Sequence, residues 1–102
     1  DSQYHGAQTF YTKESFSSKK LAISLQTALR EILEPENDRE ALLKSEEIII
    51  TKNCKVTTAI VECGFLSNQD EERKLVDESY QTKIAESIKA GVDNYLTVIA
   101  PK

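Results

Sequence analysis

The fold of this chain is decided by the stretch VTTAIVECGFL at residues 56–66. Its first six residues form a continuous run of β-branched and apolar side chains, without the regular alternation of a half-exposed strand. A continuous run is typical of a strand that is covered on both faces. We therefore expect residues 56–61 to form a strand near the centre of a sheet. Glu62 follows at its carboxyl end, the edge where open α/β sheets bind their ligands.

Glu62 is the candidate functional residue that this pattern singles out. Apolar surroundings disfavour the charged form of a carboxylate and raise its pKa toward the range useful for general acid and base catalysis. The alternative interpretation is structural, with Glu62 marking the point where the strand reaches water or pairing with a lysine. Its position in the sequence favours neither interpretation over the other.

Three elements are expected before this strand. Residues 6–11, GAQTFY, begin with glycine and end in aromatic side chains, which predicts a strand. Candidate N-caps at residues 15–18 open a helix whose apolar positions recur at helical spacing until Glu34 and Pro35 stop it. The charge-rich residues 36–44 lead into a short strand at residues 47–51, where three isoleucines favour extended backbone.

Two helices are expected after it. Asn68 and Glu71 have the spacing of a capping box, and the helix dipole alone accounts for the acidic residues 70–72. Gly91 weakens the last helix by about 1 kcal/mol relative to alanine, which predicts close packing at that position. The apolar face of this helix consists of Ile84, Ala85, Ile88, Val92, Tyr95 and Leu96.

The order strand, helix, strand, strand, helices is that of an α/β layered domain. Three strands are few for a sheet with a covered central strand, so the chain fits a piece of a larger sheet better than a complete one. There is no Met in the sequence, which predicts that Asp1 is not the translation start. No signal peptide is visible at residues 1–5.

Composition limits the chain to one domain and excludes some partners. Its 102 residues carry 13 Lys and Arg against 17 Asp and Glu, a net charge of −4 without a basic stripe, so no nucleic-acid partner is expected. No apolar run approaches the roughly 20 residues of a membrane-spanning helix. Cys54 and Cys63 match no common zinc or redox spacing and are expected to be buried thiols, with a disulfide between them left open. A single histidine, His5, cannot build a zinc site.

Residues 58–68, TAIVECGFLSN, with the acidic residues 70–72 and Leu75, resemble the signature near the end of zinc-dependent N-acetylmuramoyl-L-alanine amidases. The strand at residues 6–11, at its distance upstream, resembles the same family, particularly the spore-cortex amidases of endospore-forming bacteria. The likeness covers nearly the whole chain. It implies a mixed sheet flanked by helices, incomplete on its N-terminal side. Residues 1–102 are then the C-terminal portion of a single amidase catalytic domain.

The resemblance also implies an activity and its site. The family cleaves the amide between N-acetylmuramic acid and L-alanine in peptidoglycan, which places the protein on the outer side of the cytoplasmic membrane, in the cell wall or spore cortex. Glu62 matches the catalytic glutamate that works beside a zinc-bound water. The zinc ligands of the family, two histidines and a glutamate, fall upstream of Asp1. This chain alone is therefore expected to hold no zinc and to be inactive, and its substrate-binding residues stay unassigned.

Two hypotheses follow from these observations. In the first, the complete protein is a zinc-dependent amidase and this chain supplies Glu62. In the second, the chain is a non-catalytic piece that binds the wall or docks another protein. In either case, exposed strand edges predict association with the missing N-terminal half or with copies of this chain.

Overall fold

A computed structural model describes residues 5–12, 15–44, 56–64 and 68–99, and every structural statement below refers to these residues. Three strands form one sheet: β1 (Gln8–Thr12), β2 (Leu42–Lys44) and β3 (Ile60–Glu62). The helices are α1 (Phe16–Ala28), which continues as a π-helical turn over Leu29–Leu33, then α3 (Gln69–Leu75) and α4 (Glu78–Ile99). The alternation of strands and helices confirms the predicted α/β class.

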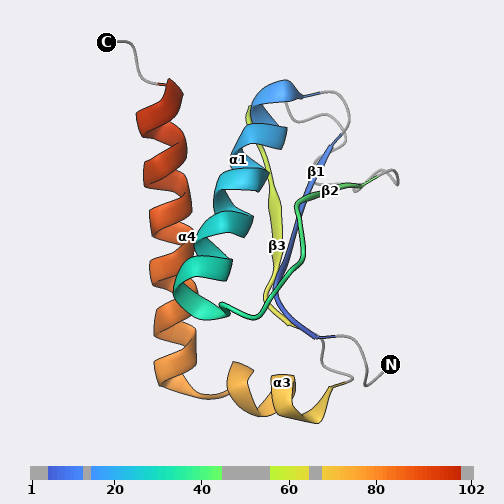
Figure 1. Ribbon diagram of the computed structural model, residues 1–102, viewed down its shortest axis with the longest axis vertical. Coiled ribbons are helices and arrows are strands. Elements are labelled where there is room, and N and C mark those ends of the chain that lie inside the picture. The colour runs from blue at the N-terminus through green and yellow to red at the C-terminus, as the bar shows by residue number, and fades with distance from the viewer. Residues whose placement is uncertain (1–4, 13–14, 45–55, 65–67, 100–102) are drawn as a thin grey trace.

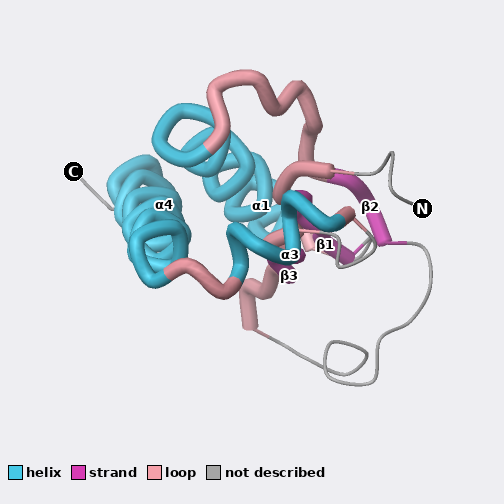
Figure 2. Tube along the Cα trace, turned by 90° about the horizontal axis from the view of Figure 1, so that it is seen from below, coloured by secondary structure: helices cyan, strands magenta, loops and turns pink. Residues whose placement is uncertain are grey.

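The described sheet is mixed, as expected, and has the order β2-β1-β3. Strand β1 runs parallel to β2 and antiparallel to β3. Helix α1 lies between the sheet and α4, so that α4, α1 and the sheet form three successive layers (Figure 1). Seen from below, the same order holds, and α3 lies beneath one end of the sheet (Figure 2). Both long helices are therefore on one side of the sheet.

The expectation that residues 56–61 form a strand near the centre of a sheet is not met within the described residues. In the described sheet the centre is β1, whereas β3 lies at an edge and pairs only from Ile60 to Glu62. The chain before Ile60 leaves the sheet toward α1, where the Thr58 amide donates a hydrogen bond to the Ser18 hydroxyl. Val56 is accordingly 71% exposed. A β-branched run favours extended backbone, but the partners available to it decide where pairing stops.

Strand β1 begins two residues later than predicted. Gly6 has a φ of +90°, a conformation that glycine adopts readily and that is incompatible with a strand. Strand β2 was not expected, because its three residues lie in the charge-rich segment 36–44; its parallel pairing with β1 defines it. The strand predicted at residues 47–51 lies outside the described residues.

The predicted start and end of α1 are confirmed. Its N-cap is Ser15, whose side chain accepts a hydrogen bond from the Ser18 amide over 3.0 Å. The helical backbone ends at Leu33, immediately before Glu34 and Pro35. A proline ring cannot continue a helix, because it lacks the amide donor and clashes with the preceding turn.

The predicted apolar face of α4 is partly correct. Ile84 and Tyr95 are buried, but Ala85, Val92 and Leu96 are exposed, and the remaining buried positions are Ser87 and Gly91. The face is rotated because small residues allow α4 to approach α1. The predicted close packing at Gly91 is confirmed: a side-chain carbon there would lie 2.8 Å from Leu25 Cα. The Ser24 hydroxyl also donates to the Gly91 carbonyl oxygen over 2.6 Å.

Candidate active site

The candidate catalytic residue Glu62 is the last residue of β3 and lies opposite Gln8 of β1. It thus stands at the carboxyl end of its strand, as the sequence predicts. Its side chain is exposed, and no described ion pair joins it to a lysine. The apolar surroundings expected for this carboxylate are therefore not found among the described residues. An exposed carboxylate is accessible to a large substrate.

Beside Glu62, the backbone of residues 5–9, which we call the β1 entrance, is held by two buried glutamates. The Gly6 amide donates to Glu71 Oε1 over 2.6 Å, and the Ala7 amide donates to Glu34 Oε1 over 2.9 Å. Glu34 and Glu71 are only 4% and 3% exposed. Hydrogen bonds from backbone amides to carboxylates are short and strong, which is how a buried carboxylate is tolerated.

Two amides of side chains complete the β1 entrance. Gln26 of α1 donates to the Ala7 carbonyl oxygen and accepts from the Thr9 amide over 2.7 Å, in the manner of a neighbouring strand. Asn37 donates to the same Ala7 oxygen over 3.0 Å. Asn37 also lies against Gly6, where a side-chain carbon would come within 3.0 Å of its Nδ2 atom. A substitution at Gly6 would therefore meet both this contact and an unfavourable φ.

Arginine side chains link the β1 entrance to residues 37–40. Arg39 donates to the His5 carbonyl oxygen over 2.9 Å and to Gln8 Oε1 over 3.2 Å. Gln8 in turn donates to the Glu40 carbonyl oxygen, and Arg30 donates to the Asn37 and Arg39 carbonyl oxygens. These contacts fix the segment that precedes β2 against β1.

The capping and dipole interactions that the sequence predicts explain only part of the first turn of α3. Asn68 is the N-cap, and its side-chain oxygen accepts from the amides of Asp70 and Glu71, as predicted. The dipole explanation is insufficient for Glu71, because its buried carboxylate accepts a hydrogen bond from a residue 65 positions away. The capping-box spacing from Asn68 separates Glu71 from the exposed Glu72 beside it, but it does not predict a hydrogen bond to Gly6. The helix spacing places both residues in the first turn, and the tertiary partner explains why Glu71 is buried.

Cys63 and Tyr80 both lie close to Glu34, and Tyr80 also lies close to Glu71. Burial, followed by the nearby negative charge of Glu34, raises the pKa of the Cys63 thiol. Burial and then the charges of Glu34 and Glu71 raise the pKa of Tyr80 well above its ordinary value. Cys63 is a free cysteine and only half-buried, whereas Cys54 lies outside the described residues. Deprotonation of either side chain is thus disfavoured, and Cys63 is a poor nucleophile at neutral pH.

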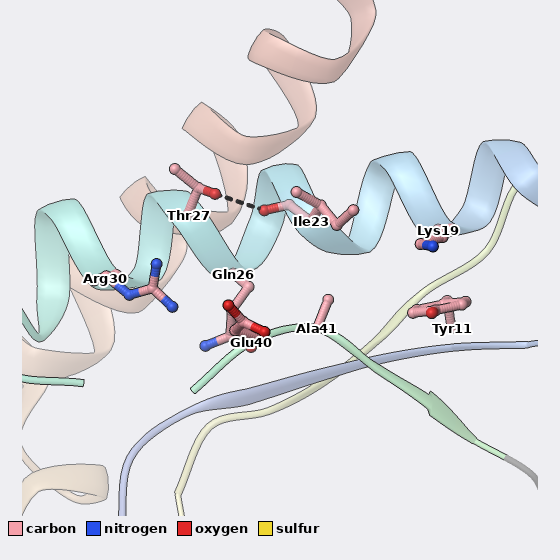
Figure 3. A pocket seen from close by; sticks show the side chains of 8 residues that line it. All are labelled: Tyr11, Lys19, Ile23, Gln26, Thr27, Arg30, Glu40 and Ala41. Carbon is pink, nitrogen blue, oxygen red and sulfur yellow. Dashed lines mark hydrogen bonds between the residues drawn. The ribbon is translucent and has the colours of Figure 1, made fainter. Parts of the chain in front are cut away.

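A separate cavity of about 400 Å³ lies between α1 and the segment that leads to β2 (Figure 3). Its lining includes Lys19, Ile23 and Arg30 from α1 and its continuation, and Tyr11 from β1. Glu62 is not among the lining residues, and the Arg30 guanidinium already donates to backbone oxygens. The cavity is therefore not assigned to the reaction site.

A catalytic zinc takes three protein ligands from histidine, cysteine and acidic side chains. No three such side chains gather suitably anywhere in the described ranges, 5–12, 15–44, 56–64 and 68–99. These residues do not fit a zinc centre, and no chemical step is assigned to a metal here. No helix among the same residues is both long and apolar enough to span a membrane.

The fold and the sequence both match N-acetylmuramoyl-L-alanine amidases. A sequence model of the family N-acetylmuramoyl-L-alanine amidase matches residues 1–94. This chain belongs to that family of hydrolases, which confirms the resemblance seen in the sequence.

Two relatives illustrate the match. The germination-specific N-acetylmuramoyl-L-alanine amidase of Bacillus subtilis is 35% identical over 95 residues, which are 93% of this chain and 39% of that protein. The CwlD amidase of Clostridioides difficile, solved in complex with the GerS lipoprotein, is 41% identical with a TM-score of 0.92. That match covers 96% of this chain and 49% of the CwlD chain.

A third match, an N-acetylmuramoyl-L-alanine amidase from Clostridium difficile 630, is 28% identical with a TM-score of 0.86. It covers 98% of this chain and 53% of that chain. The present chain thus spans about half the length, or less, of the relatives it matches.

Proposed function

We propose that residues 1–102 are the C-terminal portion of one amidase catalytic domain, and that the complete protein hydrolyses the amide between N-acetylmuramic acid and L-alanine in peptidoglycan. The family match over residues 1–94 is the observation that carries this proposal. The name of the Bacillus subtilis relative, a germination-specific amidase, supports the proposal that the complete protein cleaves spore peptidoglycan outside the cytoplasmic membrane.

Glu62 is the catalytic residue in this proposal. Water adds to the lactyl carbonyl carbon, the bond from that carbon to the L-alanine nitrogen breaks, and the leaving amine takes up a proton. A carboxylate beside the scissile amide can accept the proton of the attacking water and return it to the amine. The exposed position of Glu62 at the end of β3 supports this role, because a polymeric substrate can reach it.

Zinc belongs to the complete enzyme in this proposal. Its ligands lie upstream of Asp1, as the resemblance implies, and it supplies polarisation of the carbonyl when bound. Metal analysis of the complete protein and of the 102-residue chain tests this arrangement. The expected result is stoichiometric zinc in the complete protein only, and tight zinc binding by the short chain would contradict it.

The activity is tested by incubating the complete protein with purified peptidoglycan and identifying the products by mass spectrometry. Stem peptides with a free L-alanine amino group are expected, together with glycan that retains the lactyl carboxylate. A Glu62→Ala variant with unchanged zinc content should release neither product. Release of these products by that variant, or cleavage at another bond, would refute the proposal.

A second candidate function is wall binding or protein docking, without catalysis by this chain. The observation that favours docking is the complex of the Clostridioides difficile CwlD amidase with a lipoprotein. A pull-down of the complete protein on intact peptidoglycan separates the two functions. Wall binding without any amide cleavage, unchanged by Glu62→Ala, would support the non-catalytic function over the amidase.

Association with a missing half or with another copy is also part of the proposal. Within the described sheet, β2 is an edge strand, and its Leu42 and Leu43 are 49% and 46% exposed. Unpaired strand edges with apolar side chains favour pairing with another chain. Sedimentation of the 102-residue chain should show association, and a compact stable monomer would contradict this expectation.

A further inference from the structure

The carboxylate of Glu71 lies at the end of the antiparallel β1–β3 pair where β1 begins and β3 ends. On one side it accepts the hydrogen bond of the Gly6 amide over 2.6 Å. On the other side it lies against Gly64, where an added side-chain carbon would be 3.3 Å from Glu71 Oε1. Helix α3 therefore reaches the residues that flank both strands, Gly6 before β1 and Gly64 after β3, through a single buried side chain.

Register connects this contact to Glu62. Gln8 pairs with Glu62, and Gly6 and Gly64 each lie two residues away from this pair, Gly6 before β1 and Gly64 after β3. Glu71 thus lies between Gly64, two residues after the proposed catalytic glutamate, and Gly6, two residues before its partner Gln8. Glu34 accepts from Ala7, the residue before Gln8, and its charge acts on Cys63, the residue after Glu62.

This arrangement is costly unless the carboxylate keeps its partner. Burying a carboxylate without hydrogen bonds is strongly unfavourable, and Glu71 is 3% exposed. Strand β3 is short and lies at an edge of the described sheet, so few backbone bonds hold its end. Contacts beyond Glu62 are then needed to hold its backbone in one place.

We infer that Glu71 is a positioning residue for Glu62: its carboxylate clamps Gly6 to Gly64 and thereby fixes the direction of the Glu62 side chain. This inference rests on the proposed function, in which Glu62 transfers the proton. Displacement of a reacting group by about 1 Å is enough to lower a rate on the order of 100-fold. In this inference the clamp acts on Glu62 and not on substrate binding, so its loss should change kcat more than KM.

The test measures kcat and KM of the complete protein for peptidoglycan fragments. Glu71→Ala should lower kcat about 10- to 100-fold with little change in KM. Glu71→Gln should recover part of this loss, because its amide oxygen can still accept from Gly6. Gly64→Ala displaces the Glu71 carboxylate by a different route and should also lower kcat. The matched control is Glu72→Gln, an exposed neighbour in the same helical turn, which should retain the parental kcat.

A double-mutant cycle separates positioning from general structural damage. Glu62→Asp shortens the catalytic side chain and retains a measurable rate. If Glu71 acts through Glu62, the combined variant loses less activity than the product of the two single losses. Independent, multiplicative losses would overturn the inference.

The remaining outcomes are also decisive. A parental kcat in Glu62→Gln would overturn the proposed catalytic role of Glu62 itself. An inactive Glu62→Gln beside a fully active Glu71→Ala would overturn only the positioning role. If Glu71→Ala does not fold, the kcat values of Glu71→Gln and Gly64→Ala decide, and parental values in both would contradict the clamp.

Discussion

The contact between α1 and α4 differs in kind from the β1 entrance. At the helix contact, Gly91 has no side chain, and this absence lets α4 approach the backbone of Leu25. At the β1 entrance, the backbone is held by long polar side chains from distant parts of the chain, above all Glu34 and Glu71. The stability of the helix contact depends on close packing, and that of the β1 entrance depends on charge and hydrogen bonding. The two regions should therefore respond to different perturbations.

The largest loss of stability is expected from a substitution that fills the contact between α1 and α4. Gly91→Val places atoms where a single side-chain carbon already lies 2.8 Å from Leu25 Cα and Cδ2. Backbone cannot yield as a flexible side chain can, so the free energy of unfolding should fall by about 3 kcal/mol. Urea denaturation of the complete protein measures this, with Ala85→Val on the exposed side of α4 as the control. Equal losses in the two variants would contradict close packing at Gly91.

A smaller effect is expected at the β1 entrance. Glu34→Ala removes the acceptor of the buried Ala7 amide and leaves that donor without its partner. The cost of such an unsatisfied group is about 2 kcal/mol. The same denaturation experiment measures it, with the exposed Glu31→Ala as the control. A variant as stable as the parent would show that water replaces the carboxylate without loss.

The smallest effect at neutral pH is expected for Tyr80→Phe. The Tyr80 hydroxyl is buried and has no hydrogen-bond partner among the described residues, so its removal should cost nothing at pH 7. At alkaline pH the two proteins should differ. Burial, with the charges of Glu34 and Glu71, holds the pKa of Tyr80 in the folded state above its ordinary value of 10.0.

The sign of the pH effect follows from this raised pKa. Below pH 10 the tyrosine is protonated in both states, and its contribution to stability is fully present. Above pH 10 the unfolded chain loses its proton first, so the parent protein loses stability as pH rises. The raised pKa of Cys63 likewise lowers stability as pH rises, beginning near the ordinary thiol pKa of 9.0. Denaturation at pH 7, 9 and 10.5 should show a smaller alkaline loss for Tyr80→Phe, and identical losses would contradict the buried environment of Tyr80.

The same contrast explains how much could be predicted from the sequence. The caps Ser15 and Asn68 and the close packing at Gly91 follow from local spacing and intrinsic preference, and the structure confirms them. Strand β2 escaped prediction because its parallel pairing with β1, more than 30 residues earlier, is not visible in a local pattern. Residues 56–61 carry the residue types of a central strand, yet topology places β3 at an edge.

The site was predicted to a similar extent. Glu62 lies at the end of its strand, as its position in the sequence indicates, but the exposure of its side chain depends on neighbours that the sequence does not specify. The buried glutamates were missed for the same reason. Glu34 follows the end of a helix and Glu71 stands in the first turn of another, and their partners are 27 and 65 residues away. Helix-end preferences account for the residue type at both positions, so the sequence gives no sign of their distant hydrogen-bond partners.

The most direct test of the central claim is the kcat of Glu62→Gln in the complete protein, measured on a soluble muramoyl-L-alanine substrate beside Glu72→Gln. Glutamine preserves the shape of the side chain but cannot carry the proton. General acid and base catalysis contributes at least about 100-fold, so kcat should fall by that factor or more in Glu62→Gln. Glu72→Gln should retain the parental value. A parental kcat in Glu62→Gln would contradict the assignment of catalysis to this residue.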